Sequence, residues 1–244
     1  MGQFKGKTAV ITGGSTGIGL ATAVRLAEQG AYVFITGRRK TELDAAVETI
    51  GAASVTAVQG DVSVPADLDR LYDAVRGRGQ GVDVLFANAA VASVATLAET
   101  TEEHLDEIFG INVRGVVFTV QKALPLLNNG ASVILNASTN AERGDAAFGA
   151  YGASKAAVRS FARTWAGELI GRGIRVNAVS PGPTETPGLN GVVGDAKADL
   201  AASLPIGRMG RVEEVVAVVE FLASARSSFV LGANFYVDGG SNQV

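Results

Sequence analysis

The stretch YGASK at residues 151–155 places a tyrosine and a lysine four positions apart among small residues. If the stretch is helical, the two positions share a face, and the phenol of Tyr151 lies beside the ammonium of Lys155. A positive charge beside a phenol favours the phenolate, so we expect the pKa of Tyr151 to fall below its usual value of about 10. Such a pair would donate and accept protons near neutral pH. Two ordinary surface residues of an alanine-rich helix are the simpler interpretation of an isolated pattern, so the rest of the chain must support the chemical one.

A glycine-rich stretch, TGGSTGIG at residues 12–19, follows the apolar run at residues 8–12. Glycines at positions 13, 17 and 19 in a strand-to-helix turn let the backbone turn tightly and approach a pyrophosphate, which then lies at the helix N-terminus. The first gap is wider than in the common Gly-x-Gly-x-x-Gly pattern, which changes the path of the loop but not the physics. At this place in the chain the stretch predicts a dinucleotide site, with an ordinary glycine-rich turn as the alternative.

Two arginines follow the second predicted strand, in the stretch TGRRK at residues 36–40. A site for NAD commonly places a carboxylate there, to hold the 2′-hydroxyl of the ribose. This chain has Gly37, Arg38 and Arg39 instead. A guanidinium suits a 2′-phosphate through its charge and its forked hydrogen bonds, so the sequence favours NADP. The alternative is that the two arginines simply begin an exposed helix.

Short apolar runs rich in β-branched residues alternate with longer amphipathic patterns along the whole chain. Strands that are apolar along their length and separated by helices indicate a parallel sheet covered on both faces. We therefore predict an α/β fold with a single doubly wound domain of the Rossmann type over residues 1–244, built on a seven-stranded parallel sheet. The segment 183–210 is the longest irregular stretch and a candidate lid over a substrate site. The predicted strands are 8–12, 31–36, 54–59, 82–87, 131–137, 173–180 and 230–237, and the predicted helices are about 18–29, 41–50, 65–76, 101–127, 151–170 and 211–223.

Composition excludes several classes of protein. The 244 residues carry a net charge of −3, which gives no general electrostatic reason to bind nucleic acid or an anionic membrane. The chain has no cysteine and a single histidine, His104, so we expect no disulfide, no metal site and no Ser-His-Asp triad. No signal-like segment and no apolar run long enough to span a bilayer occur. We therefore expect a cytoplasmic protein without a membrane partner.

Taken together, the motifs resemble those of the classical short-chain dehydrogenase/reductase family, in the order that the family shows and along nearly the whole chain. Ser138 precedes Tyr151 by 13 residues, the spacing usual in that family. The resemblance implies an oxidoreductase of the 3-oxoacyl carrier-protein reductase or carbonyl reductase kind. The stretches that carry it are TGGSTGIG at 12–19, NAA at 88–90, INVRG at 111–115, LNAST at 135–139, YGASK at 151–155 and NAVSPGPTET at 177–186.

The resemblance implies a catalytic set of four residues. Tyr151 would be the general acid in carbonyl reduction and the base in alcohol oxidation. Lys155 would hold the ribose of the nicotinamide and lower the pKa of Tyr151. Ser138 would bind the substrate oxygen, and Asn112 would hold a water that links Lys155 to solvent. Considered alone, Ser138 could instead cap the end of a strand, and Asn112 could mark a helix kink.

The resemblance also implies cofactor contacts beyond the glycine loop. Asn88, after the fourth strand, would lie beside the adenosine ribose, and Pro181 and Gly182 would bend the chain around the nicotinamide. The backbone of Thr184 would recognise the carboxamide, with Thr186 nearby. The full predicted cofactor set is Gly13, Ser15, Thr16, Gly17, Ile18, Gly19, Arg38, Arg39, Asp61, Val62, Asn88, Ala89, Tyr151, Lys155, Pro181, Gly182, Thr184 and Thr186.

Two features of the sequence leave the contacts with the adenosine part of the cofactor undecided. Asp61, after the third strand, is a candidate acceptor for the adenine amine with Val62 packed nearby, but it could equally cap a loop. The family usually has Asn-Asn-Ala-Gly after the fourth strand, where this chain has Ala-Asn-Ala-Ala at 87–90. The missing asparagine and glycine remove a side-chain anchor and some backbone freedom, which affects the local cofactor contacts and not the chemistry.

The residues expected around the catalytic set are mostly small or apolar, which favours a neutral ketone, aldehyde, 3-oxoacyl group or secondary alcohol as the substrate. The leading hypothesis is an NADP-dependent ketoreductase or alcohol dehydrogenase. The alternatives are an NAD-dependent sugar or steroid alcohol dehydrogenase and a non-catalytic NADP sensor, which would be expected to lack Tyr151 or Lys155. The resemblance further implies a homotetramer, with contacts from 212–224 and 230–240. The candidate substrate-facing residues are 91–94, 139–142, Phe148 and 187–204.

Overall fold

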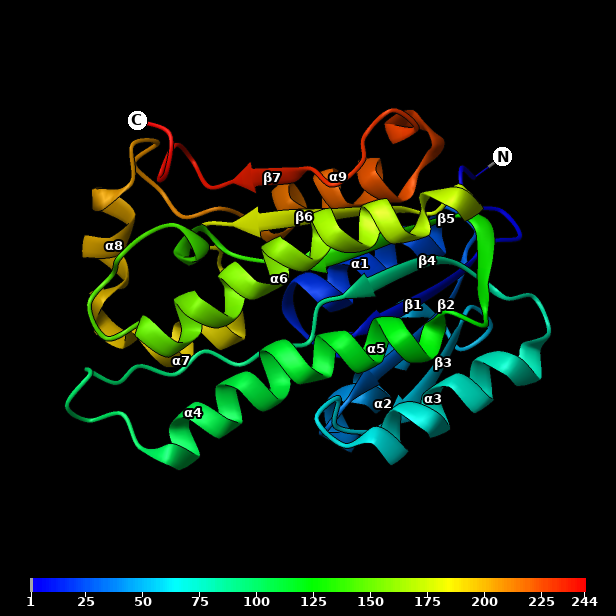
Figure 1. Cartoon of the computed structure of the whole chain (residues 1–244), viewed down its shortest axis with the longest axis horizontal. Coiled ribbons are helices and arrows are strands. Elements are labelled where there is room, and N and C mark those ends of the chain that lie inside the picture. The colour runs from blue at the N-terminus through cyan, green and yellow to red at the C-terminus, as the bar shows by residue number, and fades with distance from the viewer. Residues whose placement is uncertain (1) are drawn as a thin grey trace.

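The computed structural model describes residues 2–244, except for the side chains at positions 190, 192, 193 and 195. Within this range, seven parallel strands form one sheet in the order β3-β2-β1-β4-β5-β6-β7, and their carboxyl ends lie along one edge (Figure 1). The doubly wound parallel sheet predicted from the sequence is confirmed. The strands are β1 Thr8–Thr12, β2 Tyr32–Gly37, β3 Val55–Gln59, β4 Val82–Ala87, β5 Leu127–Asn136, β6 Arg175–Pro181 and β7 Asn234–Val237.

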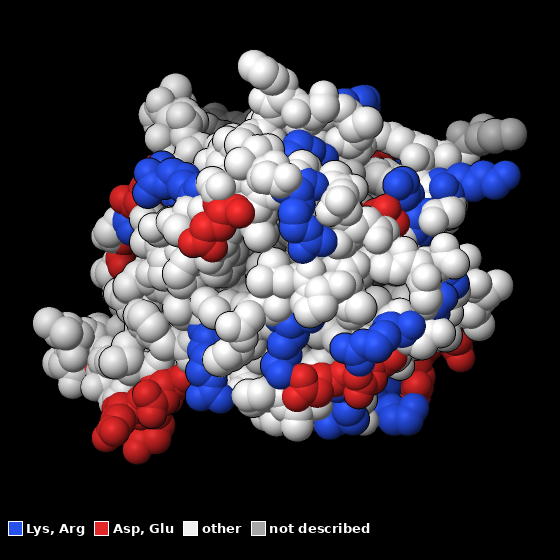
Figure 2. Space-filling view, turned by 45° about the vertical axis from the view of Figure 1, so that its right-hand side comes forward, with Lys and Arg blue, Asp and Glu red and all other residues white. Residues whose placement is uncertain are grey.

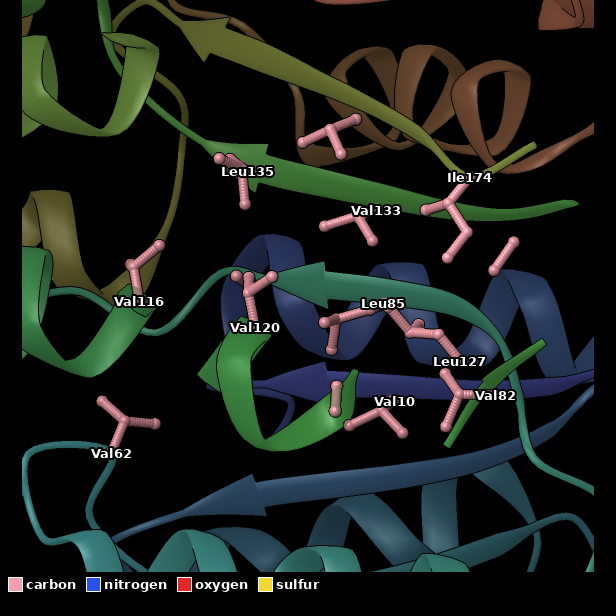
Figure 3. Packing of buried hydrophobic residues seen from close by; sticks show 14 of the residues in the cluster. Val10, Val62, Val82, Leu85, Val116, Val120, Leu127, Val133, Leu135 and Ile174 are labelled. Carbon is pink, nitrogen blue, oxygen red and sulfur yellow. The ribbon is translucent and has the colours of Figure 1, made fainter. Parts of the chain in front are cut away.

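Alternate residues of the central strands face opposite sides of the sheet, and both sides are apolar. In β1, Val10 packs in one buried cluster, and its neighbours Ala9 and Ile11 pack in the other. In β4, Leu85 and Phe86 divide in the same way. Figure 3 shows the first cluster, where side chains of neighbouring strands meet those of a covering helix. Burial on both faces explains why the strands are continuous apolar runs in the sequence. The first cluster includes residues of α3 (Pro65–Arg78), α5 (Val116–Ala123) and α6 (Gly149–Leu169), and the second includes residues of α1 (Gly17–Glu28), α2 (Lys40–Ile50) and α9 (Val212–Ala223).

The long helix predicted over residues 101–127 is interrupted and ends earlier. It consists of α4 (Glu102–Phe109), a π-helical turn (Gly110–Gly115) and α5. The wider turn lies where the buried side chain of Asn112 bonds to the backbone of Val91. A tertiary contact therefore accompanies the interruption, and single π-helical turns of this kind are frequent at functional sites.

The segment 183–210, predicted to be irregular, contains two short helices. α7 (Pro187–Val193) begins with a proline, and α8 (Lys197–Ser203) follows a short 3-10 turn. The ends of the segment are held together, because the Gly210 amide donates to the Pro183 carbonyl at 2.9 Å and the Glu185 amide donates to the Gly210 carbonyl at 2.9 Å. Both helices lie beyond the carboxyl ends of the strands (Figure 1). The segment is thus a loop with its two ends hydrogen-bonded together beside that edge of the sheet. Its action as a lid remains a prediction.

Two strands begin at other places than predicted. β7 begins at Asn234 instead of residue 230, because Gly232 adopts a φ of +66°, which interrupts an extended run. β5 begins at Leu127 instead of residue 131, because Leu127 pairs with Val82 before the register of the two strands shifts. The other predicted strands and helices agree with the structure to within about two residues, the usual uncertainty of such boundaries.

No helix in the described part of the chain is both long and apolar enough to cross a membrane. The face shown in Figure 2 carries basic and acidic side chains interleaved with uncharged ones. Charge on that face is therefore distributed rather than gathered into one basic patch.

Candidate active site

A cleft of about 680 Å³ lies at the carboxyl edge of the sheet. Its walls come from the turn after β1, the ends of β2 and β3, the residues after β4 and β5, the start of α6 and the chain after β6. In doubly wound sheets, ligands bind at this edge, next to the strands whose helices go to opposite faces. The predicted site residues that line the cleft are Gly13, Ser15, Thr16, Gly17, Ile18, Arg38, Arg39, Asp61, Val62, Asn88, Ala89, Ser138, Tyr151, Pro181, Gly182, Thr184 and Thr186, whereas Gly19, Asn112 and Lys155 are buried and do not line it.

The glycine loop after β1 turns tightly and packs closely against neighbouring parts of the chain. Gly13 and Gly17 adopt positive φ values of +63° and +55°, and a Cβ atom at Gly13 would lie 2.9 Å from the Cα atom of Ala89. Gly19 lies behind the loop, where a Cβ atom would be 2.2 Å from the Gly13 carbonyl oxygen, so glycine lets α1 begin close to the strand. The first turn of α1 contains no acidic residue. The loop and the helix N-terminus together fit the pyrophosphate of a dinucleotide.

Asn88 connects the glycine loop to the neighbouring strand ends. Its Nδ2 atom donates to the carbonyl oxygens of Thr12 at 3.0 Å and Gly13 at 3.2 Å. Its Oδ1 atom accepts a hydrogen bond from Asn136 Nδ2 at 2.9 Å. The side chain is therefore engaged within the protein and holds the loop in place. A contact between Asn88 and the adenosine ribose remains a prediction.

Arg38, Arg39 and Asp61 lie at the end of the cleft formed by β2 and β3. The Arg38 side chain is 57% exposed, and its Nη1 atom lies 3.8 Å from Asp61 Oδ2. Arg39 immediately precedes α2 as its N-cap residue and pairs with Glu42 at 2.9 Å. Asp61 Oδ1 accepts from the amide and the hydroxyl of Ser63, at 2.8 and 2.7 Å, so Asp61 caps its loop. Exposed ion pairs of this kind contribute little to stability, and both arginines can therefore rearrange toward an anion.

Tyr151 and Lys155 lie one turn apart on α6. Lys155 is 2% exposed, and its Nζ atom donates to the Asn136 carbonyl oxygen at 2.8 Å. The same Nζ atom lies 5.7 Å from the centre of the Tyr151 ring. The ring of Phe148 packs edge-on against that of Tyr151, with the ring centres 6.1 Å apart. The phenol is thus part of the cleft wall, and the buried lysine lies behind it.

The pKa of Tyr151 departs from the expectation drawn from the sequence. Removal from water raises the pKa of Tyr151 above its usual value, and the neighbouring Ser138 hydroxyl opposes this only in part. Burial also lowers the pKa of Lys155 to about 7. The expectation that Lys155 lowers the Tyr151 pKa is therefore wrong for the protein by itself. That expectation rested on the charge of the lysine alone, whereas removal from water favours the neutral form of both Tyr151 and Lys155.

Ser138 follows β5 and lines the cleft beside Tyr151. Its Oγ atom accepts a hydrogen bond from the Asn140 amide at 3.2 Å and caps a short 3-10 turn over Thr139–Ala141. Capping uses a lone pair of the oxygen and leaves its hydrogen for another partner. The capping role and the binding of a substrate oxygen are therefore compatible.

Asn112 is fully buried in the π-helical turn. Its Oδ1 atom accepts from the Val91 amide at 2.9 Å, and its Nδ2 atom donates to the Val91 carbonyl at 2.9 Å and to Ser154 Oγ at 3.1 Å. The side chain therefore joins the chain after β4 to α6, next to Lys155. The helix-kink interpretation fits these contacts, and a part in proton relay remains a prediction.

The chain after β6 passes close to the C-terminal segment. A Cβ atom at Gly182 would lie 2.8 Å from the Cα atom of Asp238, so glycine permits this approach. Thr184 Oγ1 donates to the Gly182 carbonyl at 2.9 Å, and Thr186 Oγ1 accepts from the Leu189 amide at 3.1 Å. Both hydroxyls are engaged within the protein, so contacts of this segment with a cofactor remain a prediction.

Sequence reasoning assigned no role to Asn136 and Asp145, which line the cleft, and it included Asn140 only as one of the candidate substrate-facing residues 139–142. A polar residue at the end of an apolar strand is the signal that indicates Asn136. Asn140 and Asp145 lie in a loop without periodicity, where only the structure shows their contact. Glu142, in the same predicted stretch, does not line the cleft and pairs with Arg159 instead. The predicted substrate-facing residues that do line the cleft are Val91, Ala92, Thr139, Asn140, Phe148, Pro187, Gly188, Leu189 and Leu200.

Comparison with known proteins gives matches along almost the whole chain. A family described as enoyl-(acyl carrier protein) reductase matches residues 13–242. An oxidoreductase from Sarocladium schorii is 47% identical over 245 residues, which cover 99% of this chain and 98% of that protein. The NADP-dependent (R)-specific alcohol dehydrogenase from Lentilactobacillus kefiri is 35% identical, over 98% of this chain and 97% of that protein. A crystal structure of a short-chain dehydrogenase from Burkholderia cenocepacia in complex with NADP is 35% identical, with a TM-score of 0.93 over 98% of this chain and 99% of that chain.

The parallel sheet, the glycine loop and the tyrosine–lysine pair define an oxidoreductase of the Rossmann type. The matches show more narrowly that the chain belongs to the short-chain dehydrogenase/reductase family. The family resemblance inferred from the sequence motifs is therefore confirmed.

Proposed function

We propose that this protein is an NADP-dependent oxidoreductase that reduces a ketone or aldehyde carbonyl, including that of a 3-oxoacyl group, to an alcohol, secondary in the case of a ketone. The observation that carries the proposal is that Tyr151 and Ser138 form part of the same cleft as the glycine loop. One cleft thus combines a loop suited to a pyrophosphate with a phenol and a hydroxyl suited to a carbonyl oxygen. Hydride transfer to a carbonyl requires this combination of cofactor binding and proton donation.

The chain's own residues bind the carbonyl and deliver the proton. A bound reduced nicotinamide dinucleotide supplies the hydride. Ser138 donates a hydrogen bond to the carbonyl oxygen and orients it, while Tyr151 transfers its proton to that oxygen. The raised pKa of Tyr151 keeps the phenol protonated beforehand, which suits a donor in the reducing direction. Lys155, with a pKa of about 7, exchanges protons near neutral pH and returns one to Tyr151, while a water held by Asn112 links Lys155 to solvent.

The preference for NADP is proposed on the two arginines at the end of β2. Arg38 and Arg39 line the cleft and can bind a phosphate with charge-assisted hydrogen bonds. The NADP-dependent relative from Lentilactobacillus kefiri and the NADP complex from Burkholderia cenocepacia support this preference. The pairing of Arg38 with Asp61 keeps NAD as the second candidate, because the carboxylate competes with a phosphate for the guanidinium. An NAD-dependent sugar or steroid alcohol dehydrogenase would fit that alternative.

Two proposals concern the surroundings of the site. The segment 183–210 acts as a lid, because Leu189 and Leu200 line the cleft while both ends of the segment are pinned. The protein assembles as a homotetramer, because Phe229 is fully exposed and Leu231 is 44% exposed just before β7. Light scattering tests the assembly, since a tetramer has four times the 24.9 kDa mass of the chain.

The experiment that tests the proposed function measures oxidation of the reduced cofactor with a panel of ketones, aldehydes and a short-chain 3-oxoacyl thioester. Each substrate is offered with NADPH and with NADH, and the corresponding alcohols are offered with the oxidised cofactors. We expect turnover with NADPH that exceeds turnover with NADH. Tight NADPH binding without turnover of any substrate in either direction would favour a sensor and overturn the proposal.

A further inference from the structure

Asn140 presents its amide oxygen toward Ser138. Its Nδ2 atom donates to Asp145 Oδ2 at 2.9 Å, and Asp145 Oδ1 accepts from Arg143 Nη2 at 3.2 Å. A carboxylate only accepts and a guanidinium only donates, so these two contacts determine which end of the Asn140 amide carries the hydrogens. The oxygen end must therefore face the other way, and it lies 3.5 Å from Ser138 Oγ.

The amide oxygen of Asn140 has hydrogen-bonding capacity to spare. Among the side chains that the structure describes, Ser138 makes the one hydrogen bond to Oδ1. Its length of 3.5 Å far exceeds the usual O–H···O distance of about 2.8 Å, so the bond is weak and yields readily to a better donor. Asn140 and Asp145 both line the cleft. The cleft wall beside Ser138 thus offers an acceptor.

The acceptor is held in place before any substrate binds. The backbone amide of Asn140 donates to Ser138 Oγ, and its side-chain Nδ2 atom donates to Asp145 Oδ2. The adjacent Thr139 carbonyl accepts a hydrogen bond from Asn242 Nδ2 at 3.0 Å, so the C-terminal segment braces the same loop. A preorganised acceptor costs a ligand little ordering of the protein, which makes it effective in selection.

We propose that Asn140 selects carbonyl substrates that carry a hydroxyl on the carbon next to the carbonyl, and in the oxidising direction the corresponding vicinal diols. The inference rests on the proposed function, which places the carbonyl oxygen at Ser138 and Tyr151. From that position a hydroxyl on the adjacent carbon reaches Asn140 Oδ1 and donates to it. An alkyl group of the same size leaves the acceptor without a partner. The expected preference is roughly five- to tenfold in kcat/KM, the effect of one added hydrogen bond.

The test compares three small ketones with NADPH as the cofactor. Hydroxyacetone carries the hydroxyl, butanone is its isostere without a polar group, and methoxyacetone keeps the electron-withdrawing oxygen but has no hydrogen to donate. The decisive quantity is the ratio of kcat/KM for hydroxyacetone to that for methoxyacetone, because it separates hydrogen-bond donation from the greater electrophilicity of the carbonyl. In the wild type we expect this ratio to be roughly five to ten.

Two variants assign the preference to Asn140. Asn140→Leu removes the acceptor at similar size, so the ratio should fall toward one whatever happens to the absolute rates. Asp145→Asn acts at a distance. The oxygen of the new side-chain amide would accept from Arg143, so its NH₂ group would face Asn140. The Asn140 amide would then flip so that its oxygen accepts from this NH₂ group, and its own NH₂ group would face the substrate. This variant should also bring the ratio toward one. Glu142→Gln, in the same loop but outside the cleft wall, is the matched control and should keep the wild-type ratio.

The outcomes separate the two proposals. Turnover of all three ketones with a wild-type ratio near one would overturn the selection by Asn140 and leave the proposed function intact. A wild-type preference that persists in Asn140→Leu would also overturn it, because another group would then be the acceptor. The absence of turnover for every ketone with NADPH and with NADH would overturn the proposed function and this inference with it.

Discussion

Lys155 Nζ donates a 2.8 Å hydrogen bond to the carbonyl oxygen of Asn136, the last residue of β5. The bond fixes the helix that carries Tyr151 against the central sheet. Asn136 also donates to Asn88, which donates in turn to the carbonyl of Gly13. One hydrogen-bonded network therefore joins the proton-donating wall of the cleft to the glycine loop. It holds the two parts at a fixed spacing, which a reaction between a bound cofactor and a bound carbonyl requires.

Replacing Tyr151 with phenylalanine tests the proton donor. The ring that packs against Phe148 is kept, so stability should change little, but no group remains to protonate the carbonyl oxygen. We expect Tyr151→Phe to lower kcat by roughly 10²- to 10⁴-fold, the usual contribution of a positioned acid. Binding of NADPH, followed by its fluorescence, should weaken by no more than about tenfold, since the hydroxyl contributes at most one modest hydrogen bond. Turnover close to that of the wild type would show that Tyr151 is not the acid.

Charge reversal at Arg38 tests the preference for NADP. Arg38→Asp removes a guanidinium from the cleft and places a carboxylate where a ribose hydroxyl can donate to it. We expect the ratio of kcat/KM for NADPH to that for NADH to fall by roughly 10- to 100-fold, the effect of one charge-assisted contact. Arg76→Asp is the control, because Arg76 is 59% exposed, much like Arg38 at 57%, but lies on α3 away from the cleft. An unchanged ratio in Arg38→Asp would assign cofactor choice to other residues.

The depressed pKa of Lys155 predicts how stability depends on pH. Its folded value of about 7 lies below the value of about 10.4 for an exposed lysine, so between these values the unfolded chain binds more protons than the folded one. The contribution of Lys155 to the free energy of unfolding therefore rises with pH, by at most about 1.4 kcal/mol per pH unit. Above about pH 10 the raised pKa values of Tyr72 and Tyr151 act in the opposite direction, because the unfolded chain loses their protons first.

Urea unfolding of the wild type and of Lys155→Met at several values between about pH 7 and pH 9 measures this contribution. The wild type should gain stability relative to the variant as the pH rises. The exposed Lys5 gives the control, since Lys5→Met should keep the pH dependence of the wild type. Parallel stability curves for the wild type and Lys155→Met would mean that the folded protein does not depress the pKa of this lysine.

The sheet and its covering helices could be predicted because their signal is local. Apolar runs such as residues 8–12 are buried on both faces, and helical patterns between them have the period of a covered helix. From the sequence, a kink at Asn112 is only an alternative, because the neighbouring residues are compatible with a regular helix. It depends on bonds to Val91 and on the approach of Val62, whose side chain would lie 2.8 Å from a Cβ atom at Gly115.

The candidate site shows the same division. The spacing of Tyr151 and Lys155 is local and predicts their shared face, which the structure has. The direction of the Tyr151 pKa depends on burial by elements distant in the sequence, so a rule based on the neighbouring charge gives the wrong sign. The orientation of the Asn140 amide likewise depends on Asp145 and Arg143 together, although all three lie within six residues. A pattern can place such residues near one another, but it cannot say which atom faces the substrate.

A strained residue in the same loop gives a test of stability that does not involve catalysis. Ala147 has a φ of +64°, the left-handed region that disfavours any side chain, and its carbonyl accepts a hydrogen bond from the Ala95 amide at 3.0 Å. Glycine adopts this conformation without strain, although it gives the unfolded chain more freedom. The relief should exceed that loss, so we expect Ala147→Gly to raise the free energy of unfolding by roughly 0.5–1 kcal/mol. Ala146→Gly is the matched control, because Ala146 is exposed and has no positive φ, so glycine there should be neutral or destabilising. Equal effects of the two substitutions on the urea midpoint would mean that the backbone at Ala147 relaxes from this conformation in solution.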